Sequence, residues 1–130
     1  VLNMVEKNEI YKCDVCGNVV EVLTVGGGQL VCCNKPMELM TEKSDDEGQE
    51  KHVPIVEKNE DKLIVKVGSV SHPMTEEHHI EWIEINMLDL GKIIKKYLKP
   101  GDKPEVPFCN HSKNVEVRAY CNLHGLWKSK

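Results

Sequence analysis

The 130-residue chain contains 17 basic and 21 acidic side chains, which gives a formal net charge of -4 with neutral histidines. Nucleic-acid binding depends on a basic surface that attracts phosphates, so this charge disfavours a nucleic-acid partner. The sequence has no apolar run of about 18 residues, the length that spans a bilayer. Charged side chains interrupt residues 1–12, so we expect neither a membrane span nor a signal peptide, and we expect a cytoplasmic protein.

Four of the six cysteines lie between Cys13 and Cys33, near the start of the chain. This clustering favours metal binding over a disulfide framework, whose cysteines would be spread along the sequence. Apolar residues 19–25 and 30–31 flank three consecutive glycines, which predicts a hairpin with a loose turn. The region has few bulky residues for a core of its own, so we expect a metal to stabilise it.

The four clustered cysteines have the pattern of a tetrahedral thiolate site. Cys13 and Cys16 frame a tight turn, and Cys32 with Cys33 supplies two more sulfurs from the far end of the predicted hairpin. The C-x-x-C spacing is common to zinc ribbons and rubredoxin-like iron sites, so spacing alone leaves iron and zinc open. Neighbouring residues of a strand point to opposite faces, so the adjacent pair requires the backbone to turn between its two side chains.

An acidic, aperiodic run begins near residue 40 and predicts a boundary between a first domain, residues 1–40, and a second, residues 41–130. Beyond it, short β-rich stretches alternate with turn sequences at residues 52–57, 62–70, 79–87, 105–108 and 114–120. This spacing predicts a small antiparallel β-sandwich. The third stretch should contain a bulge, because its apolar positions change face after Trp82. Residues 88–98 fit either a helix or a strand and loop.

Histidines gather in the second domain beside the predicted strands and turns. A single histidine is more often a surface or hydrogen-bonded residue than a ligand, so the prediction of a metal site rests on their grouping. The grouping lies in segments 50–54, 71–82 and 120–127, which contain His52, His72, His78, His79, Cys121 and His124. We expect His111 to be a loop residue and Cys109 to be a buried thiol.

Together with the N-terminal cysteines, these segments closely resemble the desulfoferrodoxin-type superoxide reductases, from about residue 11 to residue 127 and in the family's order. The resemblance implies a desulforedoxin-like or rubredoxin-like iron module followed by an immunoglobulin-like β-sandwich, with two iron ions per chain. One iron would be bound by the four clustered cysteines. The implied ligands of the second are His52, His72, His78, His124 and, as the axial thiolate, Cys121. Its sixth position is left for superoxide.

The resemblance also implies a reaction and partners. Superoxide would be reduced to hydrogen peroxide without release of oxygen, a detoxification supplied with electrons by a rubredoxin-like donor, and the chain would form a homodimer. Lys51 would steer superoxide to the site and stabilise the bound anion. Glu50 would occupy the sixth position of the oxidised iron when substrate is absent. Backbone amides after Cys121, from Asn122 and Leu123 or His124, are expected to tune the thiolate.

Three other interpretations remain open at this point. A binding module with two structural zinc ions fits the cysteine spacings, but such modules usually carry a basic face or a recognition helix. A pure electron-transfer protein fits the four cysteines and leaves the histidine segments without a role. Nucleophilic catalysis by Cys121 with His124 is disfavoured, because such enzymes bring the base and its orienting residue from distant segments.

Overall fold

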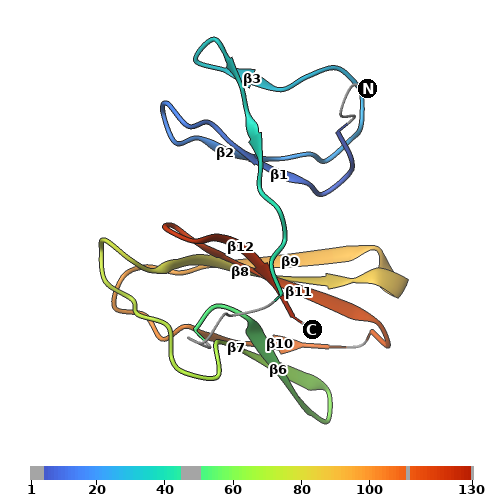
Figure 1. The fold of residues 1–130 in the computed structure, drawn as a ribbon. Coiled ribbons are helices and arrows are strands. Elements are labelled where there is room, and N and C mark those ends of the chain that lie inside the picture. The colour runs from blue at the N-terminus through green and yellow to red at the C-terminus, as the bar shows by residue number, and fades with distance from the viewer. Residues whose placement is uncertain (1–4, 45–50, 111, 130) are drawn as a thin grey trace. The chain divides into compact units, whose positions relative to one another are not determined.

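The structure is a computed structural model and describes residues 5–44, 51–110 and 112–129. The chain divides into two compact units, Val1–Thr41 and Glu42–Lys130, and the predicted mainly β fold is confirmed (Figure 1). None of the described residues belongs to a helix with the length and apolar character needed to traverse a bilayer.

The first unit contains two small antiparallel sheets. Its strands are β1 Ile10–Lys12, β2 Val19–Glu21, β3 Val31–Cys32, β4 Lys35–Pro36 and β5 Glu38–Leu39. Strand β1 lies between β2 and β5, while β3 pairs with β4. A small core forms around Val5, Tyr11 and Val22, with Leu30 and Met37 packed against it.

The predicted hairpin across the three glycines is wrong, because residues 19–25 and 30–31 do not pair with each other. Gly27 and Gly28 have positive φ and lie in a loop that leaves the flanking segments free to find other partners. Short turns specify strand pairing more strongly than a long glycine-rich link does. Here the turns that contain the cysteines connect the paired strands β1 to β2 and β3 to β4.

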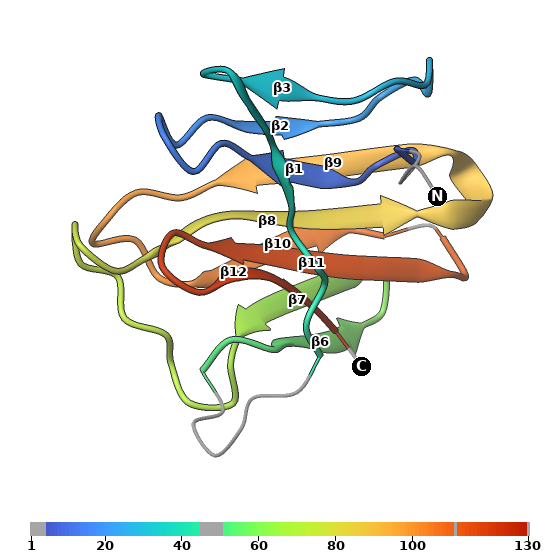
Figure 2. The same ribbon diagram turned by 45° about the horizontal axis from the view of Figure 1, so that its top comes forward.

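The second unit is an antiparallel sandwich of a three-stranded and a four-stranded sheet, which form two layers in Figures 1 and 2. The first sheet has the order β10 Glu105–Cys109, β7 Lys62–Val67, β6 Pro54–Asn59. The second has the order β12 Gly125–Lys128, β11 Val115–Cys121, β8 Ile80–Met87, β9 Lys92–Tyr97.

Alternating side chains from both sheets form the core of the sandwich. Leu63, Val65 and Val67 of β7 are at most 1% exposed, as their alternation predicts. In β8, Trp82 pairs with Tyr120 while Ile80 pairs with Cys121, so one extra residue, Glu81, forms the bulge. The predicted bulge is confirmed, but it precedes Trp82 instead of following it.

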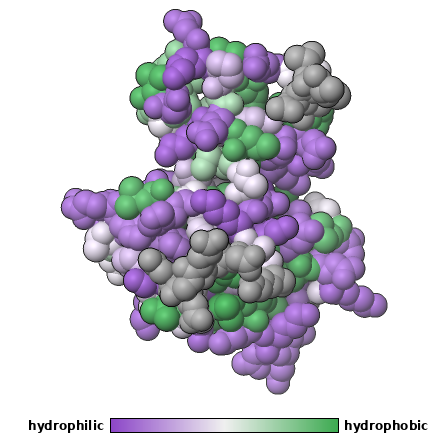
Figure 3. Space-filling model, viewed as in Figure 1, coloured by the Kyte–Doolittle hydropathy of each residue, from purple (hydrophilic) through white to green (hydrophobic). Residues whose placement is uncertain are grey.

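Other parts of the second unit could not be predicted correctly from the sequence alone. Residues 88–98 form a short 3-10 helix, η1 Leu88–Leu90, and the strand β9, which pairs with β8. Strand β12 was not predicted from the sequence. The expectation that Cys109 is buried is wrong: it is exposed, because Val106 and Phe108 take the inward positions of β10. Much of the visible surface of the unit is hydrophilic (Figure 3).

Candidate metal centres

The four N-terminal cysteines come together at two turns. Cys13, Cys16, Cys32 and Cys33 can place one sulfur each within 4.8 Å of the others. The first pair lies in the turn from β1 to β2, where Gly17 has a φ of 84°. The second pair lies at the turn from β3 to β4, where Cys33 has a φ of 53° and Asn34 one of 61°. These positive angles provide the backbone turn that adjacent cysteines need to reach one centre.

The four sulfurs form a group that suits a bound cation. The backbone N–H groups of Cys16 and Val15 donate to Cys13 Sγ at 3.5 and 3.4 Å, and they lower the pKa of Cys13 to about 6. Close contact with the Cys16 and Cys32 sulfurs raises the pKa of Cys33 to about 12. Several neighbouring thiolates repel one another without a metal, and a divalent cation removes that penalty.

A second cluster forms at one end of the sandwich. His52 precedes β6, His72 and His78 belong to the connection from β7 to β8, and Cys121 ends β11. Because the paired strands are antiparallel, the start of β6 lies beside the end of β7, and the start of β8 beside the end of β11. One ligand atom from each of these four residues lies within 4.8 Å of the others.

His124 lies against this second cluster. Its Nδ1 is 3.0 Å from His52 Nε2 and 3.9 Å from Cys121 Sγ, and its ring centroid is 4.9 Å from that of His78. His124 is exposed, whereas His52 and His72 are buried, so the cluster is open to solvent on the His124 side.

Two buried nitrogen atoms of the cluster have no hydrogen-bond partner within the part of the chain that the structure describes: Nε2 of His72 and Nε2 of His78. Nδ1 of His72 is 2.7 Å from the Pro73 carbonyl, which accepts only when Nδ1 carries the proton, so Nε2 is left with a free lone pair. A buried acceptor without a partner costs about 1–3 kcal/mol. A metal ion at the centre would satisfy both nitrogens, and the donor set therefore fits one.

Burial keeps the two histidines His72 and His78 in the neutral form that binds metals, and it has the opposite effect on Cys121. It lowers the pKa of His72 to about 4 and, with the neighbouring His124 and His52 rings, lowers the pKa of His78. Neutral imidazole is the form that ligates. Burial also raises the pKa of Cys121, opposed by the backbone amides of His124 and Leu123. The Asn122 amide was also expected to tune the Cys121 thiolate, but its N–H donates to the His79 carbonyl at 3.1 Å instead.

Two residues that the sequence did not single out support the rings of the candidate ligands. Trp127 stacks on His52 with a centroid distance of 4.6 Å and an angle of 16°, and its Nε1–H donates to the His124 carbonyl at 3.1 Å. Lys43 Nζ donates to the same carbonyl at 3.1 Å and lies 5.2 Å from the Trp127 ring centroid. Trp127 lies within one of the motif segments, but no feature of the sequence around it predicts its contact with His52.

The remaining predicted site residues have different surroundings. Lys51 is half-buried, and its charge contributes, after burial and the His124 and His52 rings, to the lowered pKa of His78. Glu50 and His111 lie outside the described residues. Nδ1 of His79 is 3.0 Å from the Thr75 carbonyl, and His79 is not part of either ligand cluster.

Four thiols in one unit and a histidine–cysteine cluster in another define a protein with two separate metal-binding groups. Comparison with family models agrees with this organisation. The model described as desulfoferrodoxin, N-terminal domain, matches residues 5–40, and the model described as desulfoferrodoxin matches residues 44–130. The chain therefore belongs to the desulfoferrodoxin family.

Relatives of the chain match it over nearly its whole length. A desulfoferrodoxin homolog from Archaeoglobus fulgidus is 57% identical over 126 residues, covering 97% of this chain and 99% of the relative. A desulfoferrodoxin from Syntrophotalea carbinolica is 56% identical over 127 residues, covering 98% and 99%. The crystal structure of the superoxide reductase from Treponema pallidum matches with a TM-score of 0.73 and 30% identity, covering 94% of this chain and 96% of that one.

Proposed function

We propose that the chain is a superoxide reductase that converts superoxide to hydrogen peroxide at an iron ion bound by the histidine–cysteine cluster. The reaction consumes one electron and two protons for each superoxide and releases no oxygen. Membership of the desulfoferrodoxin family and the likeness to a solved superoxide reductase support this proposal. The observation that carries it concerns the buried Nε2 atoms of His72 and His78, which have no hydrogen-bond partner among the described residues. Both histidines place a ligand atom within 4.8 Å of one from Cys121.

The proposed ligands have distinct roles. His52, His72, His78 and His124 would hold the iron through neutral ring nitrogens, and Cys121 would hold it through its sulfur. Iron bound by four neutral imidazoles and one thiolate supplies a one-electron donor with a net positive charge that attracts a small anion. The amides of His124 and Leu123 stabilise the thiolate form of Cys121, which burial alone would disfavour.

Lys51 provides the charge that attracts the substrate. Its positive charge acts on His78, whose pKa it helps to lower after burial and the His124 and His52 rings, and the same charge would attract a superoxide ion towards the cluster. The exposed side of His124 offers a route for solvent protons to the product. For Glu50 we retain the role that the family implies, which is to occupy the open iron position when substrate is absent.

The four-cysteine group would hold the second iron, within a module of residues 1–40, and residues 41–130 would form the reductase domain. Iron is preferred to zinc here because of the family to which the chain belongs. We further propose a rubredoxin-like electron donor, a homodimer and a cytoplasmic location.

The test is to purify the protein without oxygen, measure its metals, and then supply superoxide to the reduced protein. We expect two irons per chain, and one hydrogen peroxide for each superoxide with no oxygen produced. A Cys121→Ser variant should lose the reaction, whereas a Cys13→Ser variant reduced beforehand should complete one turnover. Two zinc ions per chain, or oxygen released in the ratio of dismutation, would refute the proposal and favour a structural zinc module.

A further inference from the structure

Asn122 connects two segments that carry proposed ligands. Its Oδ1 accepts a hydrogen bond from the backbone N–H of His79 at 2.9 Å, and its Nδ2 donates to the carbonyl of Glu77 at 3.0 Å. Its own backbone N–H donates to the carbonyl of His79 at 3.1 Å. One residue, directly after Cys121, is therefore bonded to the backbone on both sides of His78.

The segment around His78 is already a closed turn. The N–H of Thr75 donates to the His78 carbonyl at 2.9 Å, and the N–H of His78 donates to Thr75 Oγ1 at 3.1 Å. These bonds shape the turn internally but do not determine its position relative to β11. Thr75 and Glu77 are exposed and His78 is only half-buried, so the core holds the turn only through its flanking residues, Met74 and Ile80. The three hydrogen bonds of Asn122 connect the turn itself to the end of β11.

We propose that Asn122 is a positioning residue, which holds His78 at the distance from Cys121 that lets both bind one metal ion. Asparagine suits this role because its short side chain both donates and accepts, and the two backbone groups that it meets are a carbonyl and an N–H. Aspartate would lose the donor, and leucine would lose both. The inference rests on the proposed metal binding at this cluster but does not depend on the reaction with superoxide.

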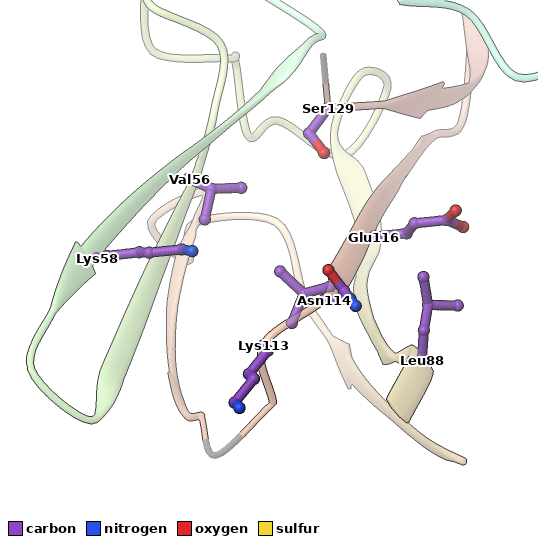
Figure 4. Close-up of a pocket in the computed structure, with 8 residues that line it drawn as sticks. Val56, Lys58, Leu88, Lys113, Asn114, Glu116 and Ser129 are labelled. Atoms are coloured by element: carbon purple, nitrogen blue, oxygen red, sulfur yellow. The ribbon is translucent and has the colours of Figure 1, made fainter. Parts of the chain in front are cut away.

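The experiment uses the 130-residue chain with zinc(II) as a diamagnetic probe, followed by NMR of the histidine rings. The rings of the four clustered histidines report on the second cluster and not on the first, because the four-cysteine group contains no histidine. The variant is Asn122→Ala. The matched control is Asn114→Ala, an exposed asparagine that precedes β11 and lines a surface pocket of about 680 Å³ (Figure 4). At about 3.3 Å per residue, it lies about 23 Å from Cys121.

We expect Asn122→Ala to weaken zinc binding at the histidine cluster by about 10–100-fold, the usual effect of removing a residue that orients a ligand. The His78 ring should lose its response to zinc while the His52 and His72 rings keep theirs. Hydrogen exchange at the His79 amide, measured without metal, should become faster because its acceptor is gone. The control should match the parent chain in all three measurements.

Several results would overturn the inference. Unchanged zinc affinity with a normal His78 response would show that the turn holds its position without Asn122. An equal weakening at all rings, accompanied by a lower melting temperature, would show a general structural role instead of a positioning one. A parent chain whose histidine rings do not respond to zinc would refute the proposed metal binding as well. A parent that binds zinc at this cluster but, when loaded with iron and reduced, does not convert superoxide to hydrogen peroxide would refute the proposed function and leave the inference about Asn122 intact.

Discussion

Gly68 follows β7 and lies against the backbone of Lys51, the residue before His52. Replacing Gly68 by alanine tests whether this close approach positions His52. Its φ is +82°, and a Cβ atom there would lie 2.5 Å from the Val70 carbonyl oxygen and 2.6 Å from both Cα and the carbonyl carbon of Lys51. All three are backbone atoms, so no side chain can rotate away. The segment at Lys51 must move, and His52 would move with it.

The magnitude follows from two separate costs. A non-glycine residue at this φ costs about 1–3 kcal/mol of backbone strain, and forcing extra volume into a packed site costs about 1–3 kcal/mol more. Gly101 provides the control, because its φ is +92° and a Cβ there would have no neighbour within 4 Å among the described residues. Gly101→Ala therefore carries only the backbone strain. We expect the two variants to differ by about 2 kcal/mol, which is about 8–16 °C in melting temperature for a domain of this size.

Thermal unfolding of the metal-free variants, followed by circular dichroism at one pH, measures this difference. Zinc titration of the histidine rings then shows whether the displaced His52 binds less well in Gly68→Ala than in Gly101→Ala. Equal melting temperatures for the two variants would refute the reasoning about the close approach. A large difference in stability with identical zinc affinity would refute its link to His52.

Three further perturbations test the surroundings of the cluster. Lys51→Ala should slow superoxide capture about tenfold and flatten its ionic-strength dependence, while Lys51→Arg should retain both, as stopped-flow kinetics at several salt concentrations can check. Trp127→Leu removes the stacking on His52 and should weaken zinc binding about tenfold in a chelator competition, whereas Trp82→Leu, which removes a stacking contact with a different ring, should not. Because burial lowers the pKa of His72 from 6.5 to about 4, the unfolded chain takes up a proton first as the pH falls. The metal-free chain should therefore lose stability between pH 6.5 and pH 4 in urea unfolding, and His72→Gln should reduce that loss.

Local signals in the sequence were sufficient for the broad fold. Alternating burial in β7 follows directly from the order of Leu63, Val65 and Val67. Residues 88–98 could not be assigned in this way, because their apolar positions fit two periods and only pairing with β8 selects the strand. Strand β12 is short, and its Trp127 is buried through contacts with residues far away in the sequence.

The sequence by itself determined the mainly β class, the family and the candidate ligands, since these depend on periodicity and on residue types within short segments. Only the tertiary structure decided how the segments pair and which residues support the candidate ligands. The cysteine turns belong to two different hairpins, and Asn122 is bonded to the turn that carries His78. Such contacts join residues far apart in the chain, so no local pattern specifies them. In the second unit they form because antiparallel pairing brings the ends of different strands together at one end of the sandwich.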